Sequence, residues 1–171
     1  KICQEGMQAN FHTPNGMHVK FISRELAQLF RKTGFAQPRL GFETSSRELQ
    51  GKTGAKATNE EFSRALGYLR EAGYNKKDIG VNILIGLPGQ DVQAVKDSVA
   101  FAGSFGCRIF LEEYSPIPNT PEYFKSGLPV DADPLLHNNS AFLMQTDERY
   151  RQFQEIKDQV HVLNRALMRK V

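Results

Sequence analysis

The sequence contains few cysteines, no long apolar run and no block of like charge. Its two cysteines, Cys3 and Cys107, are too few and too unpatterned for a disulfide framework. No apolar stretch approaches the roughly 18 residues that a membrane-spanning helix needs, and no signal peptide is visible. The net charge of +3 includes no lysine- or arginine-rich run, so nucleic acid is not indicated as a partner. We therefore expect a cytoplasmic protein without a membrane span.

Metal- and phosphate-binding motifs are missing as well. The four histidines have no ligand spacing, and two cysteines alone cannot complete a metal quartet. Gly51-Lys52-Thr53 has the form of the end of a P-loop, but Ser46 stands where the first glycine would be needed. Gly86-Leu87-Pro88-Gly89 does not match the dinucleotide pattern, and its proline removes a backbone donor. We therefore predict no metal site and no phosphate cradle.

What the sequence does contain is one unit, a short strand followed by a helix, repeated along the chain. Strands are expected over Ala9–Thr13, Arg39–Glu43, Val81–Ile85 and Arg108–Tyr114. Helices are expected over Ile22–Lys32, from Thr58 to Gly73, and over Asp91–Phe105. This alternation predicts an α/β fold with a parallel sheet. About four units are half of a TIM-like (β/α)₈ barrel or the core of a doubly wound sheet.

Local patterns identify the buried helix faces. Thr58 and Glu61 fit a capping box. The buried stripe of the helix that they open is predicted to be Phe62, Ala65, Leu66 and Leu69. In the first helix Ser23 is the expected N-cap, and Ile22, Leu26, Leu29 and Phe30 are expected on the buried face.

The end of the chain is expected to differ from the repeated units. We predict a barrel-like domain over residues 1–128, and a linker with a C-terminal amphipathic helix over residues 129–171. The inward positions of that helix are predicted to be Phe153, Ile156, Val160, Leu163 and Leu167. This helix would cover the open edge or the bottom of the barrel, or bind a partner.

The segment from Val81 to Gln90 indicates where a ligand would bind. It is an apolar strand that ends at a Gly-x-Pro-Gly turn, and α/β proteins bind ligands at the carboxyl ends of their strands. Glu43, Lys56 and Asn82 are polar residues close to that edge. Each also has a simpler interpretation: Glu43 caps a turn, Lys56 is a solvated loop charge, and Asn82 is an amide satisfied by a neighbouring strand.

Five segments in this order resemble the radical S-adenosylmethionine (SAM) enzymes, particularly those that often carry a cobalamin-binding domain. They are Phe11–Gly16, Arg39–Ser45, Lys56–Thr58, Ile85–Gln90 and Tyr114–Thr120. The resemblance runs from about Phe11 to Thr120 and implies a partial (β/α)₆ barrel, of which these strands are the third to sixth. It also implies SAM as a cofactor, a [4Fe-4S] cluster in the full-length protein, and cobalamin as a further candidate.

The resemblance gives the polar residues roles. Glu43 corresponds to a residue that contacts the amino acid part of SAM, and Lys56 to a basic residue for its carboxylate. Asn82 stands where relatives often have an Asp for the ribose hydroxyls. The turn from Ile85 to Pro88, including Gly86, would pack near the adenine. Asn119 replaces the glycine of a Pro-Gly-Thr segment and can adopt the same left-handed conformation.

The three-cysteine motif that holds the family's cluster is not in this sequence. Because the chain starts at Lys1, we expect it to be the C-terminal part of a radical SAM enzyme, with no catalytic residue of its own and the missing N-terminal part as a partner. One alternative is a non-catalytic barrel-derived binding module. Another is an aldolase-like barrel enzyme with Lys56 as a Schiff-base amine. An unpaired edge strand near Ala9–Thr13 would favour self-association.

Overall fold

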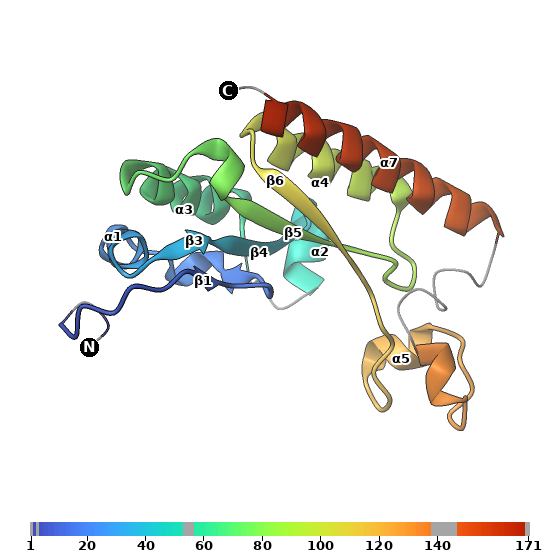
Figure 1. Ribbon diagram of the computed structural model, residues 1–171. Helices are drawn as coiled ribbons and strands as arrows, with labels where there is room; N and C mark the ends of the chain where they lie inside the picture. Colours follow the sequence, from blue (N-terminus) through green and yellow to red (C-terminus); the bar gives the residue numbers. More distant parts are fainter. Residues whose placement is uncertain (1, 3, 53–56, 138–146, 170–171) are drawn as a thin grey trace.

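The computed structural model describes residues 2, 4–52, 57–137 and 147–169 (Figure 1). Over these residues the strands form two parallel sheets. The larger has the order β2-β4-β5-β6, with β2 at Met17–His18, β4 at Arg39–Glu43, β5 at Gly80–Ile85 and β6 at Arg108–Glu113. The smaller pairs β1 (Phe11–His12) with β3 (Phe35–Gln37). These parallel sheets confirm the predicted α/β fold with part of a TIM-like barrel. The described strands do not close into a full barrel.

Helices follow the strands as the sequence pattern predicts. The α-helices are α1 (Arg24–Lys32), α2 (Arg47–Lys52), α3 (Asn59–Glu71), α4 (Val92–Ser104), α5 (Pro121–Lys125) and α7 (Asp147–Arg169). Short 3-10 helices are η1 (Val19–Phe21), η2 (Lys76–Asp78) and η3 (Pro134–His137). None of the described helices is both long and apolar enough to cross a membrane.

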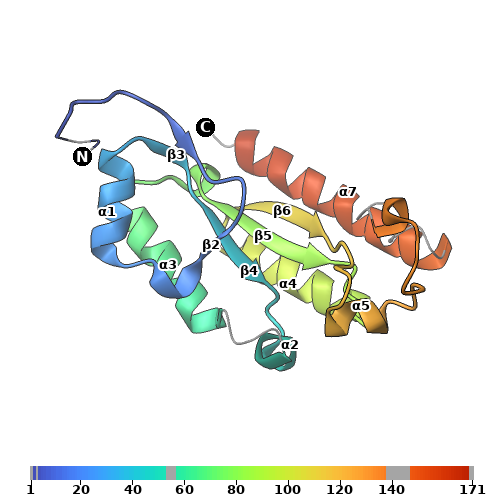
Figure 2. The ribbon, with the colours of Figure 1, turned by 90° about the horizontal axis from the view of Figure 1, so that it is seen from below.

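The hydrophobic core lies between the larger sheet and α3 and α4. Because side chains alternate along a strand, Val81, Ile83 and Ile85 of β5 all point into this core and are fully buried. The predicted stripe of α3 packs against them, and the capping box of Thr58 and Glu61 is present. Figure 2 shows the strands in front of α3 and α4, and no helix of the described residues covers the opposite face of β4 and β5.

The first strand of the larger sheet is not where we predicted it. Within the expected strand Ala9–Thr13, only β1 forms, and it pairs with β3; the edge strand of the larger sheet is β2, beyond the turn at Pro14. Pro38 separates β3 from β4 in the same way, because proline has no backbone N–H for a sheet ladder. Between these two interrupted strands, the Thr13 hydroxyl accepts a hydrogen bond from the Arg39 backbone N–H at 3.0 Å.

Two helix faces also differ from the prediction. Ser23 caps α1 as expected, but Leu29 is 49% exposed and Ala27 is buried instead. The two residues are separated by about 200° around the helix axis, so both cannot face the core. In α7 the buried stripe stops at Val160, and Leu163 is 45% exposed.

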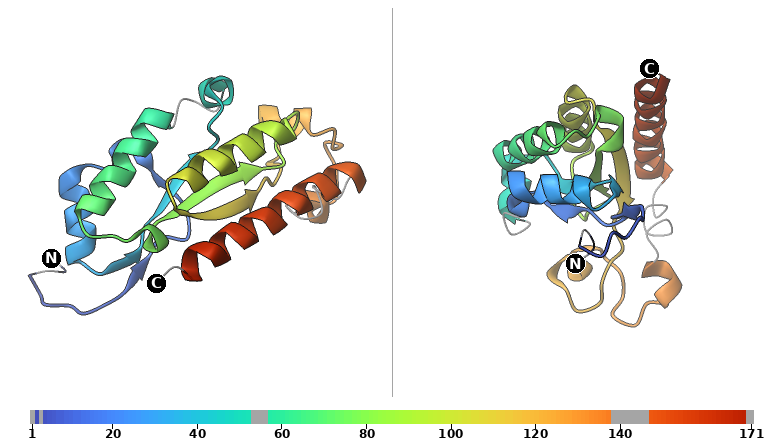
Figure 3. Two further views of the ribbon diagram at one scale, coloured as in Figure 1. Left: turned by 90° about the horizontal axis from the view of Figure 1, so that it is seen from above. Right: turned by 60° about the vertical axis from the view of Figure 1, so that its left-hand side comes forward.

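The C-terminal helix α7 lies beside α4 and along β6 (Figure 3). Phe153, Ile156 and Val160 are its buried residues. One turn beyond Val160, the Asn164 amide accepts a hydrogen bond from the Ile109 N–H at 2.9 Å and donates one to the Ile109 carbonyl at 2.7 Å. Asn164 thus satisfies a backbone position of β6 that faces away from β5, which is where an edge strand is otherwise unpaired.

Candidate functional site

A cavity of about 160 Å³ lies on the face of the larger sheet opposite the core. Its lining comes from the turn before β2 and from β4, β5 and β6: Gly16, Gly41, Glu43, Asn82, Leu84 and Glu112. These positions alternate with the core residues of the same strands, as the two faces of a sheet require. The cavity is therefore built by residues two apart on neighbouring strands.

Glu43 has a backbone conformation that few residues other than glycine adopt. Its φ is 64°, and the Thr44 N–H donates to the Phe42 carbonyl across it at 2.7 Å, which makes a γ-turn. The register between β4 and β5 shifts at this point. A left-handed residue with a Cβ costs roughly 1–2 kcal/mol, and such strain is concentrated at functional sites. The turn ends β4 and brings the Glu43 side chain to the cavity.

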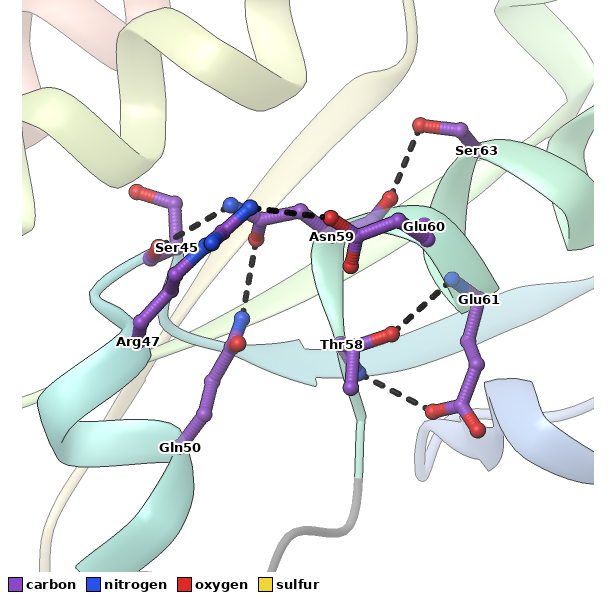
Figure 4. Close-up of polar contacts among 8 residues, drawn as sticks. All are labelled: Ser45, Arg47, Gln50, Thr58, Asn59, Glu60, Glu61 and Ser63. Carbon is purple, nitrogen blue, oxygen red and sulfur yellow. Dashed lines mark hydrogen bonds and ion pairs between the residues drawn. The ribbon is translucent and has the colours of Figure 1, made fainter.

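The loop that follows Glu43 is held in place by side chains from α2 and α3 (Figure 4). The Asn59 amide donates to the Ser45 carbonyl at 3.2 Å, and the Gln50 amide donates to the Asn59 side-chain oxygen at 2.9 Å. Gln50 also donates to the Thr44 carbonyl at 2.9 Å. These bonds offset the strain at Glu43 by fixing the residues directly after it.

A buried serine of α4 supports the same loop from the core side. The Ser98 hydroxyl accepts a hydrogen bond from the Ser45 N–H at 2.9 Å and donates to the Ala94 carbonyl at 2.7 Å. It also lies 3.4 Å from the Thr44 hydroxyl. The backbone after β4 is thus anchored to α4 as well as to α2 and α3, which makes Glu43 part of a preorganised wall.

Asn82 is the least satisfied polar residue of the cavity. The residue is 9% exposed, and its amide nitrogen donates to the Pro14 carbonyl over a long 3.5 Å. Its Oδ1 atom is buried and accepts no hydrogen bond from the described residues. An unsatisfied buried acceptor costs about 1–3 kcal/mol. A ligand that donates a hydrogen bond to this oxygen would remove that cost.

Two glycines form the side of the cavity next to β2. A Cβ on Gly16 would lie 2.6 Å from the Gly41 Cα atom, closer than any side chain can approach a backbone. The two backbones therefore contact each other directly. The absence of side chains at Gly16 and Gly41 keeps this part of the face open above Asn82.

The amino-terminal end of the same face is filled. The Arg39 guanidinium lies 3.7 Å from the centre of the Phe110 ring, as in a cation–π contact. A Cβ on Gly80 would lie 2.8 Å from the Arg39 side chain and 2.9 Å from the Phe110 ring. The stack thus depends on glycine at this position of β5.

The turn after β5 is rigid. The Gln90 N–H donates to the Leu87 carbonyl at 3.0 Å, and Pro88 and Gly89 (φ 71°) occupy the central positions that a type II turn favours. The Gln90 side-chain oxygen accepts hydrogen bonds from the Gly86 and Leu87 N–H groups at 2.8 and 3.2 Å, and its amide donates to the Leu84 carbonyl at 2.9 Å. Gln90 therefore acts as an internal brace.

The structure brings together only some of the residues that the sequence suggested. Glu43 and Asn82 line one cavity, whereas Lys56 lies outside the described residues. Ile85 is fully buried in the core, and Gly86 and Pro88 belong to the turn rather than to the cavity lining.

Sequence reasoning did not identify Leu84 and Glu112 as cavity residues or Gln90 as the brace. The alternation of strand faces could have identified the first two, because Leu84 is two residues after Asn82 and Glu112 is opposite Leu84. The brace is a long-range property of a single glutamine, and no local pattern signals it.

The chemical character of the cavity favours a ligand that donates hydrogen bonds. The polar atoms of its lining side chains are the carboxylates of Glu43 and Glu112 and the amide of Asn82, whose nitrogen is directed to Pro14. Ammonium and hydroxyl groups suit such a lining, and phosphate does not. Among the described residues no group of three histidine, cysteine or acidic side chains could hold a metal ion.

Comparisons with known proteins identify a family from the sequence and a shared fold from a solved structure. The model of the Radical SAM superfamily matches residues 2–102. No curated protein matches the chain. Among solved structures, coproporphyrinogen III oxidase (HemN) from Escherichia coli, a radical SAM enzyme, is similar with a TM-score of 0.53 and 20% sequence identity. The match covers 74% of this chain and 30% of that enzyme, and at this identity it shows a shared fold only.

Proposed function

The chain belongs to the radical SAM superfamily, and we propose that it carries the side of the SAM site formed by β4 and β5. Enzymes of this superfamily bind SAM and a [4Fe-4S] cluster. The observation that carries the proposal is the unsatisfied Asn82 Oδ1 atom in a cavity that also contains Glu43. SAM has hydrogen-bond donors of the required kinds, a ribose with hydroxyls and an amino acid end with an ammonium group.

Each residue would have one role in binding. Asn82 would accept a hydrogen bond from a ribose hydroxyl, and Glu43 would accept one from the ammonium group, a charge-assisted contact. The rigid turn from Gly86 to Gly89 would lie beside the adenine. We propose Lys56, which precedes α3 in the sequence, as the partner of the SAM carboxylate. The acceptor-rich lining of the cavity supports SAM as its ligand, because SAM is cationic at its sulfonium and ammonium groups.

The residues of this chain do not fit the iron–sulfur cluster. The sequence has two cysteines, and Cys107 is buried on the core side of the sheet. Burial also raises the pKa of its thiol to about 11, which disfavours the thiolate that binds iron. We therefore propose that the cluster is bound by another part of the protein, and we assign no step of the radical chemistry to this chain.

Calorimetric titration of the 171-residue chain with SAM tests the proposal. We expect saturable binding that adenosine and methionine each compete with. Glu43→Gln should weaken SAM binding about tenfold, since a hydrogen bond to a charged group contributes about 1.5–3 kcal/mol. Glu155→Gln, an exposed change on α7, is the matched control and should leave the affinity unchanged. No detectable SAM binding, or equal effects of the two substitutions, would overturn the assignment.

A further inference from the structure

The first turn of α7 contacts the turn after β5, although 62 residues separate them in the sequence. The Arg149 guanidinium donates a hydrogen bond to the Leu87 carbonyl. The same guanidinium lies 5.6 Å from the centre of the Phe153 ring, and Phe153 is 1% exposed. Arg149 is thus positioned by a buried residue of its own helix and reaches out to the turn.

This contact adds a second hydrogen-bond donor to the Leu87 carbonyl of the turn. The Gln90 side chain already binds the N–H groups of Gly86 and Leu87, and the Gln90 N–H binds the Leu87 carbonyl. Arg149 donates to the same carbonyl from outside. The turn is therefore held by a brace in its own segment and by a second one from α7.

The packing around this contact is loose. A cavity of about 260 Å³ lies between the starts of α4 and α7, lined by Gln90, Val92, Glu148, Arg149 and Gln152. Among the described residues of α7, Phe153 is the first that is buried. The hydrogen bond from Arg149 therefore connects α7 to the turn at a point where close packing does not.

We propose that Arg149 is a positioning residue, through which α7 fixes the turn from Gly86 to Gly89 beside the adenosine end of SAM. The proposal rests on the proposed function. Preorganising a wall of a site raises affinity because less freedom is lost on binding. Arginine suits this task, since its planar group can stack on Phe153 and donate to a carbonyl at the same time.

A ligand-independent measurement tests the contact itself. Hydrogen exchange by NMR should show faster exchange of the Gln90 N–H in Arg149→Gln than in the unaltered chain, because its acceptor, the Leu87 carbonyl, loses its outer brace. Arg149→Lys should restore part of the protection. Arg151→Gln, an exposed change two residues away, is the matched control. Unchanged exchange in Arg149→Gln would refute the positioning role.

Nucleoside affinity tests the connection to the site. Arg149→Gln should weaken the binding of SAM and of 5′-methylthioadenosine by the same factor, about fivefold. The affinity for methionine should not change. Val160→Ala loosens α7 far from the turn and controls for general destabilisation. Equal weakening of nucleosides by Val160→Ala would overturn the proposal. If the unaltered chain bound no SAM, the proposed function and the role of Arg149 in it would both fail, while the exchange result would still report the contact.

Discussion

Replacing Asn82 with leucine should stabilise the protein and weaken SAM binding at the same time. The two side chains have the same number of heavy atoms. Leucine removes an unsatisfied Oδ1 atom, whose burial costs about 1–3 kcal/mol, and forfeits only the long 3.5 Å hydrogen bond to Pro14. We expect a net gain of about 1 kcal/mol in the free energy of unfolding, which for a chain of this length raises the melting temperature by about 2–4 °C.

The loss in binding comes from the hydrogen bond that the ligand can no longer donate. One neutral hydrogen bond contributes about 0.5–1.5 kcal/mol, so SAM affinity should fall up to about tenfold. Asn82→Asp keeps the acceptor and should bind SAM at least as well as the unaltered chain. Thermal unfolding and calorimetric titration of the same samples measure both effects. A lower melting temperature with unchanged SAM affinity would refute the reasoning, because it would make the amide a structural group satisfied within the fold.

Three further outcomes follow from the geometry. In urea unfolding, Gly16→Ala should destabilise the chain by about 1–3 kcal/mol because its Cβ has no room. Gly67→Ala, in the open middle of α3, should stabilise the chain by about 1 kcal/mol. Equal effects of the two substitutions would refute the close contact between Gly16 and Gly41. Asn164→Leu should lower the free energy of unfolding by about 1–2 kcal/mol and expose the β6 edge to hydrogen exchange. Unchanged protection at Ile109 would contradict the role of Asn164 in covering that edge. Cys107 has a folded pKa raised to about 11 by burial, so its contribution to stability should be present below pH 9 and lost between about pH 9 and 11; Cys107→Ala should flatten that decline, and an identical pH profile would count against it.

The sequence predicted the layers of the fold because they depend on local patterns. The capping box at Thr58 and the stripe of α3 are short-range features, and both are present. The left-handed conformation expected for Asn119 is also observed, with φ 66°. The strands around Pro14 and Pro38 were harder to predict, since the missing N–H groups divide strands that a hydrophobic pattern shows as continuous.

The candidate site was predictable only in part. Glu43 and Asn82 follow from their places near strand ends, but Glu112 depends on the register between β5 and β6. The bonds of Gln90 and Arg149 depend on tertiary contacts that a single sequence does not reveal. The roles of Lys56, Ile85, Gly86 and Pro88 in SAM binding, the domain boundary near residue 128, the use of cobalamin and self-association through an edge strand stay predictions.

The amide of Asn164 blocks one of the two edges of the larger sheet. On the β6 side, Asn164 occupies the Ile109 backbone groups that an incoming strand would need, and α7 runs alongside. On the other side, β2 has no described strand beyond it. An added strand would therefore pair with the larger sheet at β2 and not at β6, next to Gly16 and the cavity.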